Sequence, residues 1–368
     1  MQTTAAVARE AKGDFTIETV DVGEPRDGEV LVRIAGVGLC HTDIVFRDQF
    51  VPYPLPAVLG HEGAGVIEAV GGGVTGLAPG DRVVLGFSSC GHCARCDEGL
   101  PSYCREFPPL NYAGMRLDDG SKAFSSGDEP ISSHFFGQSS FAARAIVRAR
   151  NVVKVDDPGA PLEILGPLGC GFQTGAGGVM RSMACPAGSS IAIVGGGPVG
   201  LAAVMGAKIQ ECSTIVLIEP VEARRNLAIE LGATHVIDPT ANGVAAALRA
   251  IHADGVDYAF DTSGRVDAIQ AVLEALAPRG MLGLVGVPPS AEDALPVNIA
   301  AMITFGQRLI GIMEGDSDPQ TFIPELIAAH RDGRFPFDRL IRTYPLAEIN
   351  EAVAAQKRGD CVKVVLIP

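Results

Sequence analysis

The sequence is poor in positive charge. It carries 29 lysines and arginines against 43 aspartates and glutamates, which gives a net charge of −14 at pH 7. An acidic surface repels the phosphates of nucleic acids and of anionic membranes, so we expect neither as a partner. Hydrophobic residues make up 47% of the chain and charged residues 20%, which is the composition of a globular protein rather than a disordered one.

The sequence also lacks recognisable targeting and membrane segments. Its start, MQTTAAVARE, has no basic stretch followed by an apolar core, as a secretory signal would. The uncharged run between Arg181 and Lys208 contains Pro186, Pro198 and several glycines, so it predicts a buried strand, turn and helix rather than a membrane span. Nine cysteines, an odd number, without a signal favour a reducing cytoplasm, where thiols bind metal more often than they pair.

The length of 368 residues predicts two domains. Up to about residue 155, short strands alternate with Gly- and Pro-rich turns, and strands are predicted within 28–40, 63–74 and 80–87. Residues 111–134 have little apolar periodicity and predict an exposed lobe.

From about residue 188, predicted strands alternate with predicted helices, and this pattern indicates a parallel, doubly wound sheet. Beyond residue 313 the pattern is mixed again, with a helix over 319–333 and a closing strand over 362–367. The alternating strands are predicted within 189–200, 214–219, 235–238, 256–261 and 281–286, and the helices within 201–211, 221–232 and 265–278.

A glycine turn of the form G-x-G-x-x-G follows the first of these strands directly and opens a helix. In that setting the backbone of the turn and the helix N-terminus hold the pyrophosphate of a dinucleotide. The turn contains Gly195, Gly197, Pro198, Val199 and Gly200.

Glu219 ends the next predicted strand, about twenty residues further on. A carboxylate there can bond the adenosine ribose hydroxyls and repels a 2′-phosphate, so it favours NAD over NADP. Arg224 and Arg225 lie just downstream, which leaves NADP open as an alternative.

Four cysteines lie within fifteen residues, in the spacing C-x2-C-x2-C-x7-C. Thiolates this close in sequence can surround one tetrahedral ion and leave no position for a substrate, so the loop predicts a structural zinc site. An iron–sulfur cluster is the alternative, but no second run and no Cys-Pro ending accompany the motif. The residues are Cys90, Cys93, Cys96 and Cys104.

Three further residues stand in glycine-rich surroundings: Cys40 in GLCHTD, His61 in VLGHEGAGVIEAVG and Cys170 in GPLGCGFQTG. Residue type alone does not unite them in one metal site, since buried cysteines and hydrogen-bonded histidines are common in protein cores.

Their sequence contexts, however, resemble the zinc-containing medium-chain alcohol dehydrogenases. GHEGAGVIEAVGGGV, GLCHTD, the four-cysteine loop, GCGFQTG, GGGPVG and the ending GDCVKVVLI follow that family's order over essentially the whole chain. HFFGQSSFA and FIPELIAAHRDGRFPFDRLI are similar to bacterial aryl (benzyl-type) alcohol dehydrogenases. The resemblance implies an α/β protein: a GroES-like, mostly-β catalytic domain over 1–171 and 314–368, and a Rossmann NAD-binding domain over 172–313.

The resemblance also implies a second, catalytic zinc ion in each chain. Cys40, His61 and Cys170 would bind it and leave a fourth position open for the substrate oxygen. Asp43 would orient His61, and Glu62 would lie behind the metal.

By the same resemblance, Thr42 would accept the proton of the alcohol. Position 45, where many relatives carry a histidine that relays this proton to solvent, is a valine here. The remaining implied cofactor contacts are His41 with the pyrophosphate, Thr174, Val285 and Val287 with the nicotinamide, and Lys363 with a phosphate.

The implied reaction is the reversible, zinc- and NAD-dependent oxidation of a primary aromatic or allylic alcohol to its aldehyde, by alkoxide formation and hydride transfer. Phe135 and Phe136 would line the substrate pocket, although core packing is the alternative for adjacent phenylalanines. We expect a homo-oligomer, either a dimer or a tetramer. Two alternatives are a thiol-adduct formaldehyde dehydrogenase, which needs a cationic pocket near Arg105, and a zinc-braced dinucleotide-binding protein without catalysis.

Overall fold

The chain divides between residues 170 and 171 in the computed structural model, which describes residues 1–241 and 243–368. The first unit comprises Met1–Cys170, Asp318–Ala328 and Asp338–Pro368. The second unit comprises Gly171–Ser317 and Ala329–Phe337.

The return to the first unit starts at residue 318, not at 314 as expected, and residues 329–337 interrupt it. Aromatic packing explains the interruption. The ring of Phe337 lies 5.4 Å from that of Phe172 and 4.4 Å from that of His330, all in the second unit.

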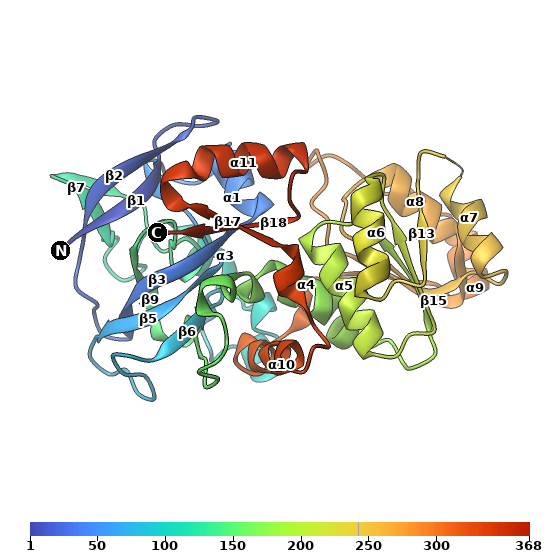
Figure 1. Ribbon diagram of the computed structural model, residues 1–368, viewed down its shortest axis with the longest axis horizontal. Coiled ribbons are helices and arrows are strands. Elements are labelled where there is room, and N and C mark those ends of the chain that lie inside the picture. The colour runs from blue at the N-terminus through green and yellow to red at the C-terminus, as the bar shows by residue number, and fades with distance from the viewer. Residues whose placement is uncertain (242) are drawn as a thin grey trace. The chain divides into compact units, whose positions relative to one another are not determined.

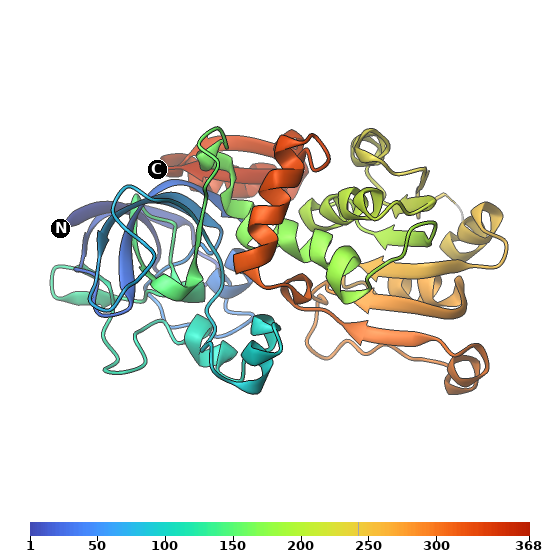
Figure 2. The same ribbon diagram turned by 90° about the horizontal axis from the view of Figure 1, so that it is seen from below.

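A seven-stranded sheet organises the first unit around β3 (Glu29–Leu39). One edge of β3 pairs with β5, and the other pairs with β9 near its start and with β18 near its end. The strand from the C-terminus therefore lies beside one from near the N-terminus, as the red and blue ribbons of Figure 2 show. The other strands are β5 (Gly63–Val70), β6 (Arg82–Leu85), β9 (Arg144–Arg148), β10 (Val152–Lys154), β17 (Ile341–Pro345) and β18 (Lys363–Ile367).

A second sheet of the first unit includes strands from the segment that the sequence predicts to be an exposed lobe. That prediction is wrong for much of 111–134, because Arg116 is only 6% exposed and pairs with Glu29, while Phe124 is 2% exposed. The strand order is β4 (Ala57–Val58), β1 (Gln2–Ala8), β2 (Phe15–Val22), β7 (Phe124–Ser126) and β8 (Glu129–Ile131).

Short helices connect these strands. The first, α1 (His41–Arg47), follows β3 directly and has Cys40 as its N-cap. The carboxylate of Asp43 accepts a hydrogen bond from the Cys40 backbone N–H at 2.9 Å, which fixes the start of the helix. The other helices are α2 (Ala94–Asp97), α3 (Phe107–Tyr112), α10 (Pro319–Arg331), which ends in the second unit, and α11 (Ile349–Arg358).

The second unit contains a six-stranded sheet in which all neighbouring strands are parallel. This is the doubly wound order of dinucleotide-binding domains, so the predicted α/β fold class is confirmed. The strand order is β13 (His235–Ile237), β12 (Thr214–Ile218), β11 (Ser190–Val194), β14 (Val256–Asp261), β15 (Leu276–Leu284) and β16 (Arg308–Gly311).

The crossover helices form two packed pairs, α5 with α6 and α7 with α8. Figure 1 shows α5 and α6 side by side in front of the strands. Because β11 continues to β12 while the chain later returns to β14 on its other side, right-handed crossovers place the second pair on the opposite face. The helices of this unit are α4 (Gly171–Gly177), α5 (Pro198–Ile209), α6 (Glu222–Leu231), α7 (Val244–Ile251), α8 (Val266–Glu274) and α9 (Ile299–Phe305).

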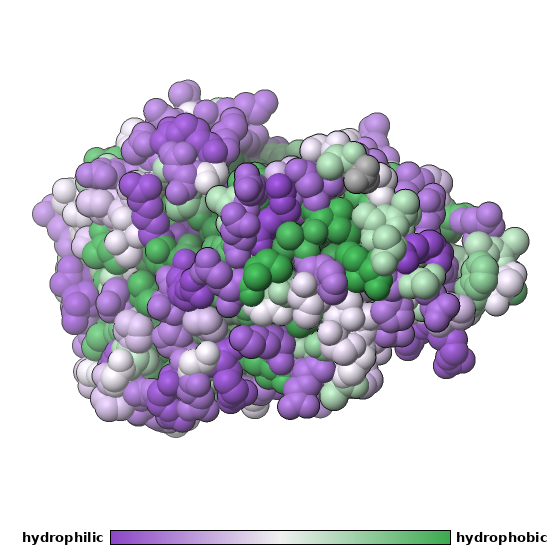
Figure 3. Space-filling view, turned by 45° about the vertical axis from the view of Figure 1, so that its right-hand side comes forward, coloured by the Kyte–Doolittle hydropathy of each residue, from purple (hydrophilic) through white to green (hydrophobic). Residues whose placement is uncertain are grey.

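Helices on both faces bury the parallel strands, which explains their continuous apolar sequences. Every residue of β11 is buried, and Val194, Val216, Leu248 and Leu282 meet in one cluster. Figure 3 shows hydrophilic residues over much of one face of the molecule, with hydrophobic residues in smaller areas between them. Within the described ranges, no helix has the length and apolarity needed to cross a membrane.

Candidate functional site

The four-cysteine loop forms a compact sulfur cluster around α2. The sulfur atoms of Cys90, Cys93, Cys96 and Cys104 all lie within 4.8 Å of one another. The Sγ atom of Cys96 is 3.7 Å from that of Cys93 and 3.9 Å from that of Cys90. Four sulfurs bound tetrahedrally at about 2.3 Å from one ion lie about 3.8 Å apart, so the cluster fits a structural zinc ion. Hydrogen bonds from backbone amides, of which that of Arg105 has the largest effect, lower the pKa of Cys93 to about 6. The lowered pKa favours the thiolate, which is the form that binds metal.

A second ligand group joins three segments that lie far apart in the sequence. Cys40 lies between β3 and α1, His61 lies between β4 and β5, and Cys170 precedes α4. Together with a carboxylate oxygen of Glu62, their ligand atoms lie within 4.8 Å of one another. The structure therefore brings together the three ligands that the resemblance implies for a catalytic metal.

His61 is held so that one ring nitrogen faces the thiols. Its Nδ1 lies 2.9 Å from Oδ1 of Asp43, a fully buried carboxylate that also accepts the backbone N–H groups of Gly60 and Cys40. Burial by itself lowers the pKa of His61, but the charge of Asp43 outweighs it and raises that pKa well above its ordinary value. Asp43 thus occupies the orienting position expected for it.

The remaining ring nitrogen of His61 has the character of a metal ligand. Nε2 is buried and has no hydrogen-bond partner among the residues that the structure describes. Two neighbours keep the pKa of Cys40 well below its ordinary value: the hydrogen bond with Cys170 has the larger effect and the nearby His61 the smaller one. One unpaired imidazole nitrogen beside two thiols fits a Zn²⁺ ion bound by two cysteines and one histidine.

Lys363 has a different contact from the one expected. Its ammonium lies 2.5 Å from Oε2 of Glu62 and donates to the Leu39 carbonyl, and the residue is 1% exposed. Burial disfavours the charged ammonium, but Glu62 raises the pKa of Lys363 above its ordinary value. Because this charge is buried and paired, we replace the expected phosphate contact with an ion pair to Glu62 behind the metal ligands.

Aromatic rings surround His61. The ring of Phe136 stacks on it at 4.5 Å with an interplanar angle of 25°, and Phe135 meets it edge-on at 5.5 Å. Phe135 is fully buried and Phe136 is 4% exposed, so both belong to the packed surroundings of the ligand. Four more rings complete the cluster: Phe46, Tyr53, Phe107 and Tyr112.

The first turn of α1 carries the two polar residues expected at the reaction. His41 is exposed, and Thr42, which lies between Cys40 and Asp43 in the sequence, is half-buried. Val45, one turn after His41 on the same helix, offers no group that could carry a proton.

The glycine turn joins β11 to α5 as predicted. A Cβ atom on Gly200 would come within 1.8 Å of the Gly195 carbonyl oxygen, so only glycine allows this approach of helix and strand. At Gly197 a Cβ atom would meet nothing within 4 Å, which leaves open space next to the backbone at the start of the helix. Pro198, the first residue of α5, needs no N–H partner. The turn and the helix start fit a bound pyrophosphate.

Glu219 follows β12 and reaches the glycine turn. Its carboxylate accepts the backbone N–H of Gly196 at 2.6 Å and that of Val221 at 2.9 Å. Arg225 is occupied by backbone carbonyls and by Asp238. Arg224, by contrast, has a buried Nε atom without a hydrogen-bond partner in the part of the chain described.

The expected nicotinamide contacts all belong to the second unit. Thr174 on α4 is 7% exposed, and its hydroxyl lies 3.3 Å from a carboxylate oxygen of Glu314. Val285, which directly follows β15, donates its N–H to the Asp261 carbonyl. Val287 is 53% exposed. The contact with Glu314 could not be anticipated, since 140 residues separate the pair in the sequence.

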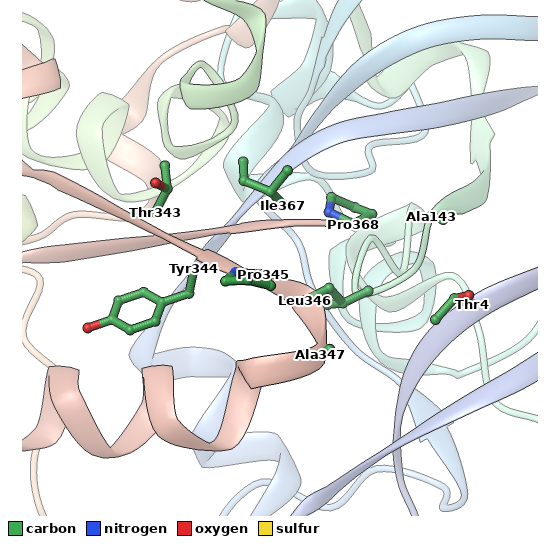
Figure 4. A pocket seen from close by; sticks show the side chains of 9 residues that line it. All are labelled: Thr4, Ala143, Thr343, Tyr344, Pro345, Leu346, Ala347, Ile367 and Pro368. Atoms are coloured by element: carbon green, nitrogen blue, oxygen red, sulfur yellow. The ribbon is translucent and has the colours of Figure 1, made fainter.

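Sequence reasoning also missed Gln138, a fully buried residue whose amide contacts the backbone of His61. Its one signal is a run of polar residues, GQSS, between the phenylalanines 136 and 141. A separate pocket of about 580 Å³ lies between the ends of β17 and β18 and the residues Thr4 and Ala143 (Figure 4). None of its nine lining residues is a predicted site residue.

Comparisons with known proteins agree with this arrangement. Residues 26–157 match the family described as alcohol dehydrogenase GroES-like domain, and residues 198–329 match the one described as zinc-binding dehydrogenase. A geraniol dehydrogenase from Castellaniella defragrans is 49% identical over 365 residues, which cover 99% of this chain and 97% of that protein.

Two solved structures share the fold over the whole chain. An alcohol dehydrogenase zinc-binding domain protein from Burkholderia ambifaria is 49% identical, with a TM-score of 0.97, and the match covers 100% of this chain and 99% of that one. The benzyl alcohol dehydrogenase of Acinetobacter calcoaceticus is 39% identical, with a TM-score of 0.96 and the same coverage. The chain is therefore an enzyme that belongs to the zinc-containing medium-chain alcohol dehydrogenase family.

Proposed function

We propose that this enzyme oxidises primary alcohols with flat, apolar bodies, aromatic or allylic, to aldehydes with NAD as the hydride acceptor, and that the reaction is reversible. The observation that carries this proposal is the group of Cys40, His61 and Cys170, whose ligand atoms lie within 4.8 Å of one another and whose histidine is surrounded by aromatic rings. Relatives named for geraniol and for benzyl alcohol, one allylic and one aromatic alcohol, support the same class of substrate.

Cys40, His61 and Cys170 are the residues that would hold the catalytic zinc ion. Three protein ligands leave one of four tetrahedral positions for an alcohol. When bound, Zn²⁺ supplies a Lewis acid that makes an alcohol hydroxyl more acidic, and NAD supplies the hydride acceptor. A pair of thiolates, favoured by the lowered pKa of Cys40, suits a soft divalent ion of this kind.

The other residues of this site orient the ligands and handle the proton. Asp43 fixes the His61 ring through Nδ1 and fixes the Cys40 backbone at the same time. Oxidation of an alcohol removes a proton from oxygen and a hydride from carbon. We assign the proton to the hydroxyl of Thr42, since it lies between these two residues in the sequence and is half-buried. Val45 cannot pass it on, so we assign its release to water or to the cofactor ribose.

The second unit would bind NAD through the glycine turn and Glu219. The carboxylate already lies at the turn, bonded to the Gly196 N–H, and has further lone pairs for the ribose hydroxyls. The same charge opposes a 2′-phosphate, whereas the unpaired Nε of Arg224 would favour one. The balance between Glu219 and Arg224 therefore sets the choice of dinucleotide.

The size of the substrate determines how strongly the enzyme should prefer larger alcohols to ethanol. A benzyl or cinnamyl group can bury about four more methylene equivalents than the methyl group of ethanol, which is worth about 3 kcal/mol. If that energy is realised in the transition state, kcat/KM rises by about a hundredfold.

The test is NADH formation across a panel of ethanol, benzyl alcohol, cinnamyl alcohol and geraniol, with formaldehyde plus a thiol as a further arm. We expect kcat/KM for the three larger alcohols to exceed that for ethanol by about a hundredfold or more. Phe136→Leu should reduce this preference. The matched control is Phe87→Leu, because Phe87 is also buried and packs at 5.6 Å on Phe107, a member of the cluster, without contacting His61. Equal efficiency with ethanol and benzyl alcohol would contradict the proposed substrate class.

A further inference from the structure

The turn that carries the two phenylalanines has an unusual backbone. His134, Phe136 and Ser139 have positive φ angles of 61°, 50° and 58°, and Gly137 between them has 68°. Each non-glycine residue in this region costs on the order of 1 kcal/mol, so such a conformation persists only where surrounding contacts determine it. Three such residues within six positions indicate that the fold requires this shape of the turn.

Gln138 lies at the centre of the turn and is fully buried. Its Oε1 accepts hydrogen bonds from the Gly63 N–H at 3.0 Å and from the Ser140 hydroxyl at 2.6 Å. Its Nε2 donates to the His61 carbonyl at 2.8 Å and to the Gly86 carbonyl at 3.1 Å. A glutamine amide has two donor hydrogens and two acceptor lone pairs, and all four are used here.

These bonds hold a short stretch of metal-site backbone at both ends. The amide bonds the residue that carries the ligand imidazole, His61, and the residue two positions later, Gly63. Between them lies Glu62, whose carboxylate pairs with Lys363 behind the ligands. The bond to Gly86 anchors the amide to the residue that follows β6.

The same turn also fixes the side chain of His61. Phe136 covers one face of the ring at 4.5 Å, and Phe135 meets it edge-on at 5.5 Å. Asp43 holds Nδ1 from α1. Backbone, ring face and Nδ1 are therefore all constrained, and Nε2 is the atom left to face the thiols of Cys40 and Cys170.

We infer that Gln138 is a positioning residue of the catalytic metal site: it holds the backbone of His61 and Gly63 so that Nε2 of His61 and the carboxylate of Glu62 keep their places beside Cys40 and Cys170. The inference rests on the proposed metal site. Gln138 acts through His61 and touches neither the metal nor the substrate. Residues that orient a metal ligand typically contribute a factor of about 10–100 to metal affinity.

Gln138→Met is the test variant, because it retains much of the volume and removes all four hydrogen bonds. The matched control is Ser139→Ala. Ser139 is fully buried in the same turn, and its hydroxyl bonds Val58 and Phe135 but not His61. Gln138→Glu is a third variant, which keeps the acceptor for Gly63 and puts an oxygen where the donor to His61 was.

Metal release to a chelator and the visible spectrum of the cobalt-substituted protein are measured beside the thermal midpoint. We expect the catalytic-site metal to leave Gln138→Met about 10- to 100-fold faster than wild type, with altered cobalt bands. Ser139→Ala should release metal at the wild-type rate even if its Tm falls as much as that of Gln138→Met. Gln138→Glu should resemble Gln138→Met, and it carries the test if the methionine variant does not fold.

Equal metal release and equal cobalt spectra in the Gln138 and Ser139 variants would show that Gln138 serves the fold alone, and would overturn the inference. Only one bound metal ion per wild-type chain would contradict the catalytic metal site itself, and the inference would fall with it. A wild-type enzyme with both metals and a clear Gln138 effect, but no preference for larger alcohols, would contradict the substrate class and support the positioning role.

Discussion

Glu29→Gln tests whether a buried ion pair holds in place the segment before the turn that carries Phe135 and Phe136. Glu29 is 6% exposed, and its carboxylate accepts Nε and Nη2 of Arg116 at 2.7 and 2.9 Å. It also lies 3.3 Å from Nε2 of His134 and accepts the Arg26 backbone N–H at 3.0 Å. His134 directly precedes Phe135, so the network reaches the aromatic cluster.

The magnitude follows from the burial of both charges. Replacing the carboxylate with an amide leaves the Arg116 guanidinium, which is 6% exposed, without a counter-charge and turns an NH₂ group toward other donors. Breaking one partner of a buried ion pair costs about 3–5 kcal/mol. For a chain of 368 residues, an unfolding entropy of about 2.1 cal/mol/K per residue means that each kcal/mol lowers Tm by about 1.3 °C, so we expect a loss of about 4–7 °C at neutral pH.

The effect should depend on pH in a defined direction. Burial raises the pKa of Glu29, but hydrogen bonds from His134 and Arg116 outweigh it and hold that pKa well below its ordinary value. A folded-state pKa below the unfolded one stabilises the fold above the unfolded pKa of about 4.3, and this contribution is lost as the pH falls through the folded pKa. The difference in Tm between wild type and variant should therefore be constant above about pH 5 and shrink in stronger acid.

Thermal melts across this pH range measure the effect, with Glu68→Gln as the matched control. Glu68 pairs with Arg144 at 2.7 Å and Arg33 at 3.4 Å, but its side chain is 27% exposed. Such a partly exposed pair contributes about 0–1 kcal/mol, so Tm should change by about 1 °C at most. If Glu29→Gln melts like Glu68→Gln, the argument from burial is refuted.

Two further predictions concern the metal and the cofactor. Cys93→Ser should remove one zinc ion per chain and lower Tm while the ligands around His61 keep their metal; a wild-type zinc content and Tm would contradict the structural zinc site. Glu219→Ala should lower the ratio of NAD to NADP catalytic efficiency by about tenfold or more, the effect of losing one charged hydrogen bond. Arg224→Ala should change the ratio in the opposite direction, and an unchanged ratio in both variants would remove these residues from cofactor selection.

Local patterns in the sequence predicted most of the framework. The alternation of apolar strands and helices after residue 188 depends on neighbours in the chain. The five predicted strands correspond to β11–β15 and the three predicted helices to α5, α6 and α8, whereas β16 and α7 were not predicted. The glycine turn follows β11 and opens α5 because its close approaches are also local. The four cysteines of the loop meet because fifteen residues cannot separate them far.

Local patterns could not predict contacts between segments that lie far apart in the sequence. Residues 111–134 look like an exposed lobe because the partner that buries Arg116, namely Glu29, lies 87 residues earlier. Lys363 looks free for a phosphate because its counter-charge, Glu62, lies far earlier in the sequence, between β4 and β5. The polar run GQSS does not reveal what Gln138 contacts, since its bonds reach 77 residues back to His61 and 75 back to Gly63.

The distribution of hydrogen bonds around His61 explains why so many segments are needed. Nε2 of His61 is buried beside the thiols of Cys40 and Cys170, where an imidazole nitrogen can serve as a metal ligand. The stacked Phe136 ring and the Asp43 carboxylate hold the imidazole ring itself, while the Gln138 amide holds the backbone carbonyl of His61. Because Asp43 lies on α1 and both Phe136 and Gln138 lie in the turn before β9, segments far apart in the sequence together determine the direction of a single ring nitrogen.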